Sequence, residues 1–179
     1  ADAGANNIYD VIVRVADGNG GSDTQAIAVA VTNLNDNSPV ITSDGGGATA
    51  SVNIAENGSA VTTVTATDAD LPAQTLSYSI AGGADAALFT INASTGALSF
   101  IAAPDFEAPG DAGANNIYDV TVQVTDGNGG ADTQAIAVTV TAVNDNTPVI
   151  TSDGGGATAA VAIGENGSAV TTVAATDAD

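Results

Sequence analysis

The sequence has no cysteine, histidine, methionine, tryptophan or lysine, and Arg14 is its single basic residue. These absences remove the usual general base, the thiol nucleophile, the Schiff-base amine and the soft metal ligands. The side-chain chemistry that remains is that of carboxylates, amides and hydroxyls. Such a set suits a hard cation with oxygen ligands, Ca²⁺ above all. A disulfide framework is also excluded, although that alone does not identify the cellular compartment.

Carboxylates are abundant where basic residues are missing: 21 Asp and Glu residues give a formal charge of −20 over 179 residues. Only 12% of residues are charged and 44% are apolar, so we expect a packed core rather than disorder. The acidic surface would repel nucleic acid and the anionic inner leaflet of a membrane, and we expect neither as a partner. No apolar run approaches the roughly 20 residues of a membrane-spanning helix, so membrane insertion is not expected. Because there is no initiating methionine, we expect the chain to be part of a longer protein.

An internal repeat organises the chain. The stretch DAGANNIYDV begins at Asp2 and again at Asp111, an offset of 109 residues, and only 13 of the 70 overlapping positions differ. Such near-identity indicates tandem duplication. If the triplet NDN closes each unit, the chain divides into the C-terminal part of one repeat (1–37), a complete repeat (38–146) and the N-terminal part of a further repeat (147–179).

Apolar residues alternate with a period of two, which predicts β-strands. Tyr118, Val120 and Val122 fall on one face of such a strand, and Asn128-Gly129 predicts the hairpin turn that follows it, because both residues tolerate a positive φ. About seven strands in one repeat predict an all-β fold, an antiparallel β-sandwich. The earlier strands are expected at 39–43, 49–54, 60–67, 74–80, 87–91 and 97–101.

The expected core of the complete repeat gathers its inward-facing apolar residues. Its members are Val64, Leu76, Tyr78, Ile80, Phe89, Ile91, Leu98, Phe100, Tyr118, Val120, Val122, Ile136 and Val138. Tyr118 is expected to bond its hydroxyl back to the backbone, as in a tyrosine corner. Asp44 and Asp132 are expected to be turn or surface residues, and Arg14 a surface residue.

Acidic residues fall in short groups rather than evenly along the chain. In an extended strand, residues two apart share a face, so Asp68 with Asp70, and Asp105 with Glu107, would aim two carboxylates at one place. Such pairs repel unless a cation lies between them. The competing interpretation of each group alone is a solvated turn. For DGNGG, a plain hairpin turn is favoured for 128–130, with Asp126 kept as a ligand.

The order of these groups resembles that of cadherin repeats, in particular the tandem cadherin-like repeats of large bacterial surface and adhesin proteins. The motifs that carry the resemblance are IAENG at Glu56, PDFE at Asp105, NDN at Asn144 and TDAD at Asp177, with VTDGNGG at Asp126. The resemblance covers the whole chain. It implies Ig-like or cadherin-like Greek-key sandwiches joined end to end as a rod, with calcium at each junction.

The resemblance also implies a set of metal ligands for each junction. The second junction would use Glu56, Asp105, Glu107, Asn144, Asp145, Asn146, Asp177 and Asp179. The first junction would use Asn35, Asp36, Asn37, Asp68, Asp70 and Asp126. Glu165 and Asp17 would serve junctions whose other halves lie outside this sequence. The first Asp of the family's DxNDN linker is replaced by Asn33 and Ala142, which predicts weaker sites or fewer ions.

Together these features predict a calcium-binding structural repeat, secreted or at the cell surface, that forms a calcium-rigidified stalk or fibre in cell-surface adhesion. Its expected partners are calcium and neighbouring repeats of the same chain, and homotypic association into fibres is left open. The alternatives are a self-associating filament or matrix module and a sandwich domain that binds carbohydrate or another partner. An enzyme is not expected, because two acids two residues apart on a strand supply no catalytic cleft.

Overall fold

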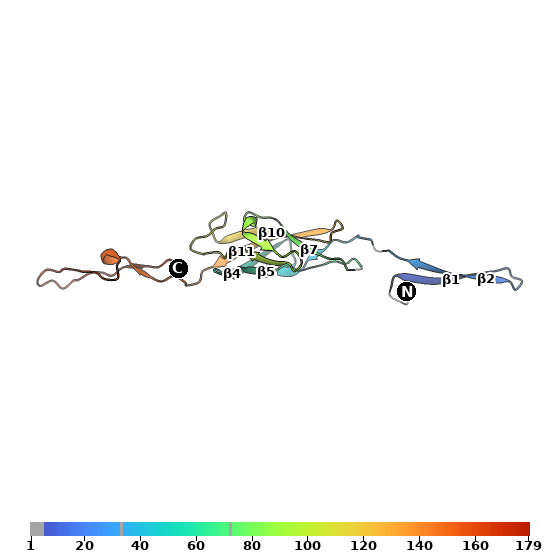
Figure 1. Cartoon of the computed structure of the whole chain (residues 1–179), viewed down its shortest axis with the longest axis horizontal. Helices are drawn as coiled ribbons and strands as arrows, with labels where there is room; N and C mark the ends of the chain where they lie inside the picture. Colours follow the sequence, from blue (N-terminus) through green and yellow to red (C-terminus); the bar gives the residue numbers. More distant parts are fainter. Residues whose placement is uncertain (1–5, 33, 72) are drawn as a thin grey trace.

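The computed structural model describes residues 6–32, 34–71 and 73–179, which form an extended row of β-structure (Figure 1). A central sandwich lies between a hairpin at one end of the long axis and a thinner C-terminal segment at the other (Figure 1). The hairpin consists of β1 (Ile8–Ala16) and β2 (Ser22–Ala30), and the C-terminal segment contains β12 (Val149–Ile150) and β13 (Ala175–Thr176). The described residues contain no α-helix, so the predicted all-β architecture is confirmed.

Two main sheets build the central sandwich. One has the strand order β4-β11-β10-β7 and the other the order β5-β9-β8. The first comprises β4 (Thr49–Ala55), β7 (Ser77–Gly82), β10 (Ile117–Thr125) and β11 (Ala131–Thr141). The second comprises β5 (Ala60–Thr63), β8 (Phe89–Ile91) and β9 (Ala97–Phe100). A two-stranded ladder joins β3 (Val40–Ile41) to β6 (Ala66–Thr67).

One strand pair departs from the expected antiparallel pattern. β11 and β4 run parallel, with Ala135 opposite Thr49 and Thr141 opposite Ala55. The two strands are far apart in sequence, so no tight hairpin turn constrains their direction, and a long connection permits parallel pairing. All other pairs in the sandwich are antiparallel.

Several predicted strands are shorter than the alternation suggested. The expected strand at 60–67 is divided into β5 and β6, and the segment at 87–91 begins with the short 3-10 turn η2 (Ala86–Leu88). A second such turn, η1 (Ser43–Gly45), follows β3, and η3 (Ser152–Gly154) follows β12. The strand expected at 74–80 is shifted to β7. Boundaries are set by tertiary pairing, which the local pattern does not contain.

The core lies between the two main sheets. All the predicted core residues are buried in it or pack against it, whereas the prediction missed Ile41, Val124 and Val140. The aromatic rings of Phe100 and Tyr118 meet edge to face with centroids 5.0 Å apart. The Tyr118 hydroxyl accepts a hydrogen bond from the Gly110 backbone N–H at 3.0 Å, which confirms the predicted bond to the backbone.

The turn between β10 and β11 differs from the predicted one. The positive φ values occur at Gly127 (76°) and Gly129 (115°) rather than at Asn128 and Gly129. The Asp126 carboxylate accepts backbone N–H groups from Asn128 at 2.7 Å and Gly130 at 3.0 Å. An Asp side chain that accepts the backbone N–H groups of the residues after it stabilises such a turn. The positive φ values fall on the glycines because glycine adopts a positive φ at less cost than asparagine does.

Two aspartates expected to be turn or surface residues form hydrogen bonds that connect distant segments. Asp132 is half-buried, and its Oδ2 accepts the Ile41 backbone N–H at 2.8 Å, so it ties β3 to β11. Asp44 has a positive φ of 50° and accepts the Thr62 hydroxyl at 3.1 Å. Asp44 is exposed and lies in the turn η1, as predicted. Asp132 instead belongs to strand β11, and the prediction missed its role because its partner is distant in sequence. Arg14 is exposed, as predicted.

The β1–β2 hairpin repeats β10–β11 in sequence and in register, but not in burial. Tyr9 pairs with Val29 as Tyr118 pairs with Val138. Tyr9 is 44% exposed, whereas Tyr118 is 2% exposed. The difference arises because 38–116 cover β10–β11, while the described residues contain no equivalent cover for β1–β2.

Candidate metal centre

Three carboxylates meet at the end of the sandwich that faces the C-terminal segment. Glu56, Asp105 and Glu107 each offer an oxygen, and these oxygens lie within 4.8 Å of one another. We call this group the upper trio. Glu56 follows β4 directly and is 3% exposed. Its two oxygens accept the backbone N–H groups of Phe106 at 2.7 Å and Val143 at 2.6 Å, so it is held by both the acidic loop and the linker.

The acidic loop that carries Asp105 and Glu107 is shaped by one of its own carboxylates. Asp105 Oδ1 accepts the backbone N–H groups of Glu107 and Ala108, both at 3.1 Å. This Asx-type turn is the local reason that the two acids of PDFE do not continue as an extended strand. The expectation that they share a strand face is therefore wrong, although the turn still brings both carboxylates to one place.

A second group, the lower trio, consists of Glu107, Asp145 and Asp179, whose oxygens also lie within 4.8 Å of one another. Glu107 belongs to both trios and so connects them. Asp179 lies in the C-terminal segment, and its carboxylate accepts the Asn146 backbone N–H at 3.1 Å and the Asn146 side-chain amide at 3.0 Å. Carboxylates from both sides of the linker therefore meet at Glu107.

The carboxylate of Glu107 lies in an unfavourable electrostatic environment. Burial raises its pKa, and the nearby carboxylates of Glu56, Asp179 and Asp105 raise it further. Its buried Oε1 has no hydrogen-bond partner in the described part of the chain. A cation between the trios would satisfy this oxygen and remove the repulsion, and a donor set made only of oxygens fits a hard cation.

The remaining residues expected at this junction lie differently. Asn146 acts as a donor, bonding Asp145 Oδ1 at 3.0 Å as well as Asp179, and this bond to Asp179 lowers the pKa of that carboxyl. Asn144 and Asp177 are exposed and belong to neither trio. Ala142 offers no side-chain oxygen, whereas Asn33 lies outside the described residues.

The first junction is organised by a clasp between Asn37 and Asp70. The backbone N–H and side-chain amide of Asn37 donate to Asp70 at 3.2 and 2.7 Å, and the side-chain bond lowers the pKa of Asp70. Asp36 accepts the same amide at 2.9 Å. Asp68 Oδ1 accepts the Asp70 N–H at 3.0 Å, while its buried Oδ2 has no partner among the described residues.

Asn35 connects the first linker to the β10–β11 turn. Its Nδ2 donates to the Asn128 carbonyl at 3.4 Å, and its Oδ1 accepts from the Gln74 side chain. Asp126 is 4% exposed, and its pKa is lowered first by the Asn128 backbone N–H and also by the Asn35 amide. No carboxylate trio forms here among the described residues.

Asp17 and Glu165 stand apart from both junctions. Asp17 accepts the backbone N–H groups of Asn19 at 2.8 Å and Gly21 at 2.9 Å, which lower its pKa as in the equivalent Asp126 turn. Glu165 is exposed and belongs to neither trio. It matches Glu56 in sequence, but the loop and linker that would hold it are not in the chain.

Sequence reasoning missed three polar residues. Asn57 donates from Nδ2 to Asp145 Oδ2 at 2.6 Å, and so ties the complete repeat to the linker. Asp85 is 5% exposed and accepts the N–H of Asp119 at 2.8 Å, and Asp111 is 6% exposed and accepts the N–H of Asn116 at 3.0 Å. The repeated ENG triplet was a signal for Asn57, whereas nothing in the sequence marked Asp85.

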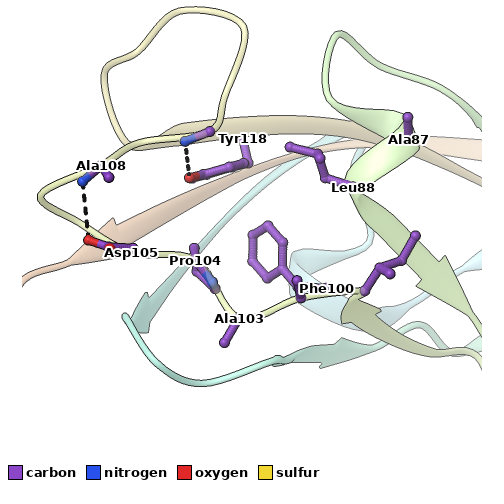
Figure 2. Close-up of a pocket in the computed structure, with 11 residues that line it drawn as sticks. Ala87, Leu88, Phe100, Ala103, Pro104, Asp105, Ala108 and Tyr118 are labelled. Carbon is purple, nitrogen blue, oxygen red and sulfur yellow. Dashed lines mark hydrogen bonds between the residues drawn. The ribbon is translucent and has the colours of Figure 1, made fainter.

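A cavity of about 300 Å³ lies beside the acidic loop (Figure 2). Figure 2 shows Asp105 at its edge, bonded to Ala108, with the Tyr118 side chain pointing inward. The walls are otherwise apolar and include Leu88, Phe100, Ile101 and Pro104. The cavity offers one carboxylate and no second polar side chain apart from the Tyr118 hydroxyl, which already accepts the Gly110 N–H. Separately, among the described residues we find no helix with the length and apolar character needed to cross a membrane.

In a comparison with known families, the cadherin domain model matches residues 50–143. Among curated proteins, human Protocadherin Fat 1 is 36% identical over 162 residues, which is 87% of this chain and 3% of that protein. Protocadherin gamma-A10 of Pan troglodytes is 33% identical over 152 residues, or 80% of this chain and 15% of that protein. The chain thus spans only a small part of these relatives.

Solved structures give the same result. The extracellular cadherin domains 3-6 of Protocadherin Gamma B2 superpose with a TM-score of 0.65 at 26% identity, covering 98% of this chain and 43% of that chain. Human CDH23 EC21-23 superposes with a TM-score of 0.70 at 21% identity, covering 97% and 55%, and supports the fold alone.

Proposed function

The chain belongs to the cadherin family, and from this membership we propose that it is a calcium-binding extracellular repeat array that forms a stalk or fibre in cell-surface adhesion. The observation that carries the proposal is the pair of carboxylate trios that share Glu107 across the linker. Carboxylates on both sides of a short linker can bind one cation together, and such a shared cation would fix the angle between neighbouring repeats. The proposed units are 1–37, 38–146 and 147–179.

Calcium is the proposed cofactor. At the second junction the trios would supply most ligands, with Asn144, Asn146 and Asp177 as the remaining candidates. At the first junction the candidates are Asn35, Asp36, Asn37, Asp68, Asp70 and Asp126, and the unpartnered Oδ2 of Asp68 supports this assignment. Because Ala142 cannot ligate, we propose fewer or weaker ions per junction than a full DxNDN linker would hold.

The proposed stiffening follows from electrostatics. Without a cation, Glu107, Asp145 and Asp179 repel one another, and the linker can relieve the repulsion by turning. A bound divalent cation would supply the positive charge that converts this repulsion into shared ligation. One orientation is then favoured, and the Asn146–Asp179 clasp would already hold the C-terminal segment near it.

Within the cadherin family, the motifs predict a more specific class, the large bacterial surface proteins. Near-identity between successive repeats supports recent duplication, which suits a long, repetitive stalk, but the relatives compared above are from animals. The bacterial source therefore stays a proposal. Its partners would be calcium and neighbouring repeats, and homotypic association into fibres is the second candidate, supported by the exposed, uncharged outer positions of β4.

Small-angle scattering tests the stalk proposal. The full chain should reach a longer, better defined maximum dimension in calcium than in chelator. Glu107→Gln should weaken this response, whereas Asp119→Asn, at an exposed site on β10, should leave it intact. An identical scattering profile with calcium and with chelator would remove the proposal. Dimension and mass that rise together with protein concentration would instead favour the self-associating filament.

A further inference from the structure

The chain contains four Asn-Gly steps, and each lies in a turn. They begin at Asn19, Asn57, Asn128 and Asn166. Glycine has no side chain to shield its backbone nitrogen, so this nitrogen can attack the side-chain amide of the preceding asparagine. The Asn57-Gly58 step is exposed and lies next to the lower trio, because Asn57 bonds Asp145.

We propose that Asn57 is a deamidation site whose rate is set by its hydrogen bond to Asp145. The Nδ2 of Asn57 lies 2.6 Å from Asp145 Oδ2, a charge-assisted contact that holds the amide toward the linker. Attack by the Gly58 nitrogen requires the side chain to swing back toward its own backbone. The bond to Asp145 must open first, so it protects the amide.

An identical sequence elsewhere in the chain lacks this hydrogen bond. Asn166 lies in the same octapeptide, ENGSAVTT, and has nearly the same backbone φ, 66° against 64° for Asn57. Both asparagines are exposed. Among the described residues, the Asn166 side chain has no hydrogen-bond partner. The two steps therefore share local sequence and φ but differ in two contacts. Asn57 has the carboxylate acceptor, whereas the Gly167 N–H, the attacking group of the second step, donates to the Gly164 carbonyl at 3.0 Å.

The reaction is balanced without any group beyond water. The Gly58 nitrogen forms a bond to Cγ of Asn57 and loses its proton, while the Cγ–Nδ2 bond breaks and ammonia leaves. Water then opens the cyclic imide at either carbonyl, which gives aspartate or isoaspartate. No oxidant, reductant or cofactor takes part.

The product changes the junction electrostatically. A carboxylate at position 57 can no longer donate to Asp145, and the two negative charges face each other beside the lower trio. The isoaspartate form also lengthens the backbone by one carbon within the turn that follows β4. The deamidated junction is more anionic and loses a bond between the complete repeat and the linker, so ageing would loosen it where no cation is present.

Peptide mapping by mass spectrometry tests this inference on the full chain. After incubation at mildly alkaline pH with chelator, Asn57 should convert to acid roughly fivefold faster in Asp145→Ala than in the unaltered chain, because the hydrogen bond to a charged acceptor no longer has to open before Asn57 reacts. The rate at Asn166 should be the same in both chains. Asp10→Ala, which removes an exposed acid on β1, should leave the rate at Asn57 unchanged.

The rate at Asn128 separates this effect from general loosening. Asn128 belongs to the same repeat but lies at the first junction, so Asp145→Ala should not alter its rate. An Asp145→Ala variant that accelerates both Asn57 and Asn128, or that accelerates neither, would overturn the inference. The experiment contains no calcium, so its outcome is independent of the proposed stalk function.

Discussion

Asn37 donates to both carboxylate oxygens of Asp70, through its backbone N–H at 3.2 Å and its side-chain amide at 2.7 Å. Asn146 makes the same clasp with Asp179 at the other junction, 109 residues later. In each case the last residue of NDN holds the last residue of TDAD. Each linker is thus fixed to the repeat that follows it by hydrogen bonds that need no metal.

The Asn37–Asp70 clasp predicts acid sensitivity. Its hydrogen bonds lower the pKa of folded Asp70, so their contribution is complete above the unfolded pKa, about 3.9, and is lost as pH falls through the lower folded value. Asn37→Ala should therefore move the Asp70 pKa upward. Carboxyl-carbon NMR titration measures the shift, and the pKa of Asp17, in a separate turn, should stay lowered. An Asp70 titration that does not move would contradict the assigned cause.

Glu107 should have the opposite effect on the pH dependence of stability, because its pKa is raised rather than lowered. Burial and neighbouring carboxylates raise its pKa, so ionised Glu107 costs stability above its unfolded pKa, and protonation relieves that cost as pH falls. In chelator, Glu107→Gln should raise the thermal midpoint of unfolding at neutral pH. In calcium the same change should lower the midpoint, because a ligand is lost. Melting curves in both buffers test this, and a shift of the same sign in both would refute it.

The Tyr118 hydroxyl gives a prediction with an internal control. Tyr118→Phe leaves the Gly110 N–H without its acceptor and should reduce the free energy of unfolding by about 1 kcal/mol. Tyr9→Phe changes the equivalent residue in the exposed β1–β2 hairpin, where Tyr9 is 44% exposed, and should have little effect. Denaturant unfolding followed by fluorescence or circular dichroism compares the two. Equal losses would mean that the hydroxyl bond is not the cause.

Some features of the fold and of the metal centre can be predicted from the local sequence pattern. Period-two alternation identified the buried face of β10, since Tyr118, Val120 and Val122 pack in the core. Asp105 and Glu107 were paired correctly, but for the wrong reason: an Asx-type turn, not an extended strand, brings them together. The local pattern contains no information on partners brought close by folding.

Long-range partners account for the other differences. The parallel pairing of β4 with β11, and the bond from Ile41 to Asp132, join residues about 90 positions apart. Burial of Ile41 follows from the same packing, since the identical residue in the C-terminal segment, Ile150, is 51% exposed. Identical sequence with different exposure shows that the surrounding strands decide burial here.

Ala142 supplies the last prediction. It stands in the second linker where the family's DxNDN motif has aspartate, one residue before Val143, whose N–H donates to Glu56 Oε1 at 2.6 Å. It is exposed, so a carboxylate can be added without displacing core atoms. Ala142→Asp should raise calcium affinity, since a further charged oxygen ligand strengthens such sites, and should lower stability in chelator, since it adds to the repulsion.

Isothermal titration of the full chain measures both affinity and the number of ions bound. Ala93→Asp adds the same charge in an exposed loop far in sequence from the linker and should leave the calcium affinity nearly unchanged. An increase confined to Ala142→Asp would assign the effect to the linker position, because net charge is matched in the two variants. Equal increases would instead reflect the general attraction of a more acidic surface for a divalent cation, and would count against Ala142 as the missing ligand position.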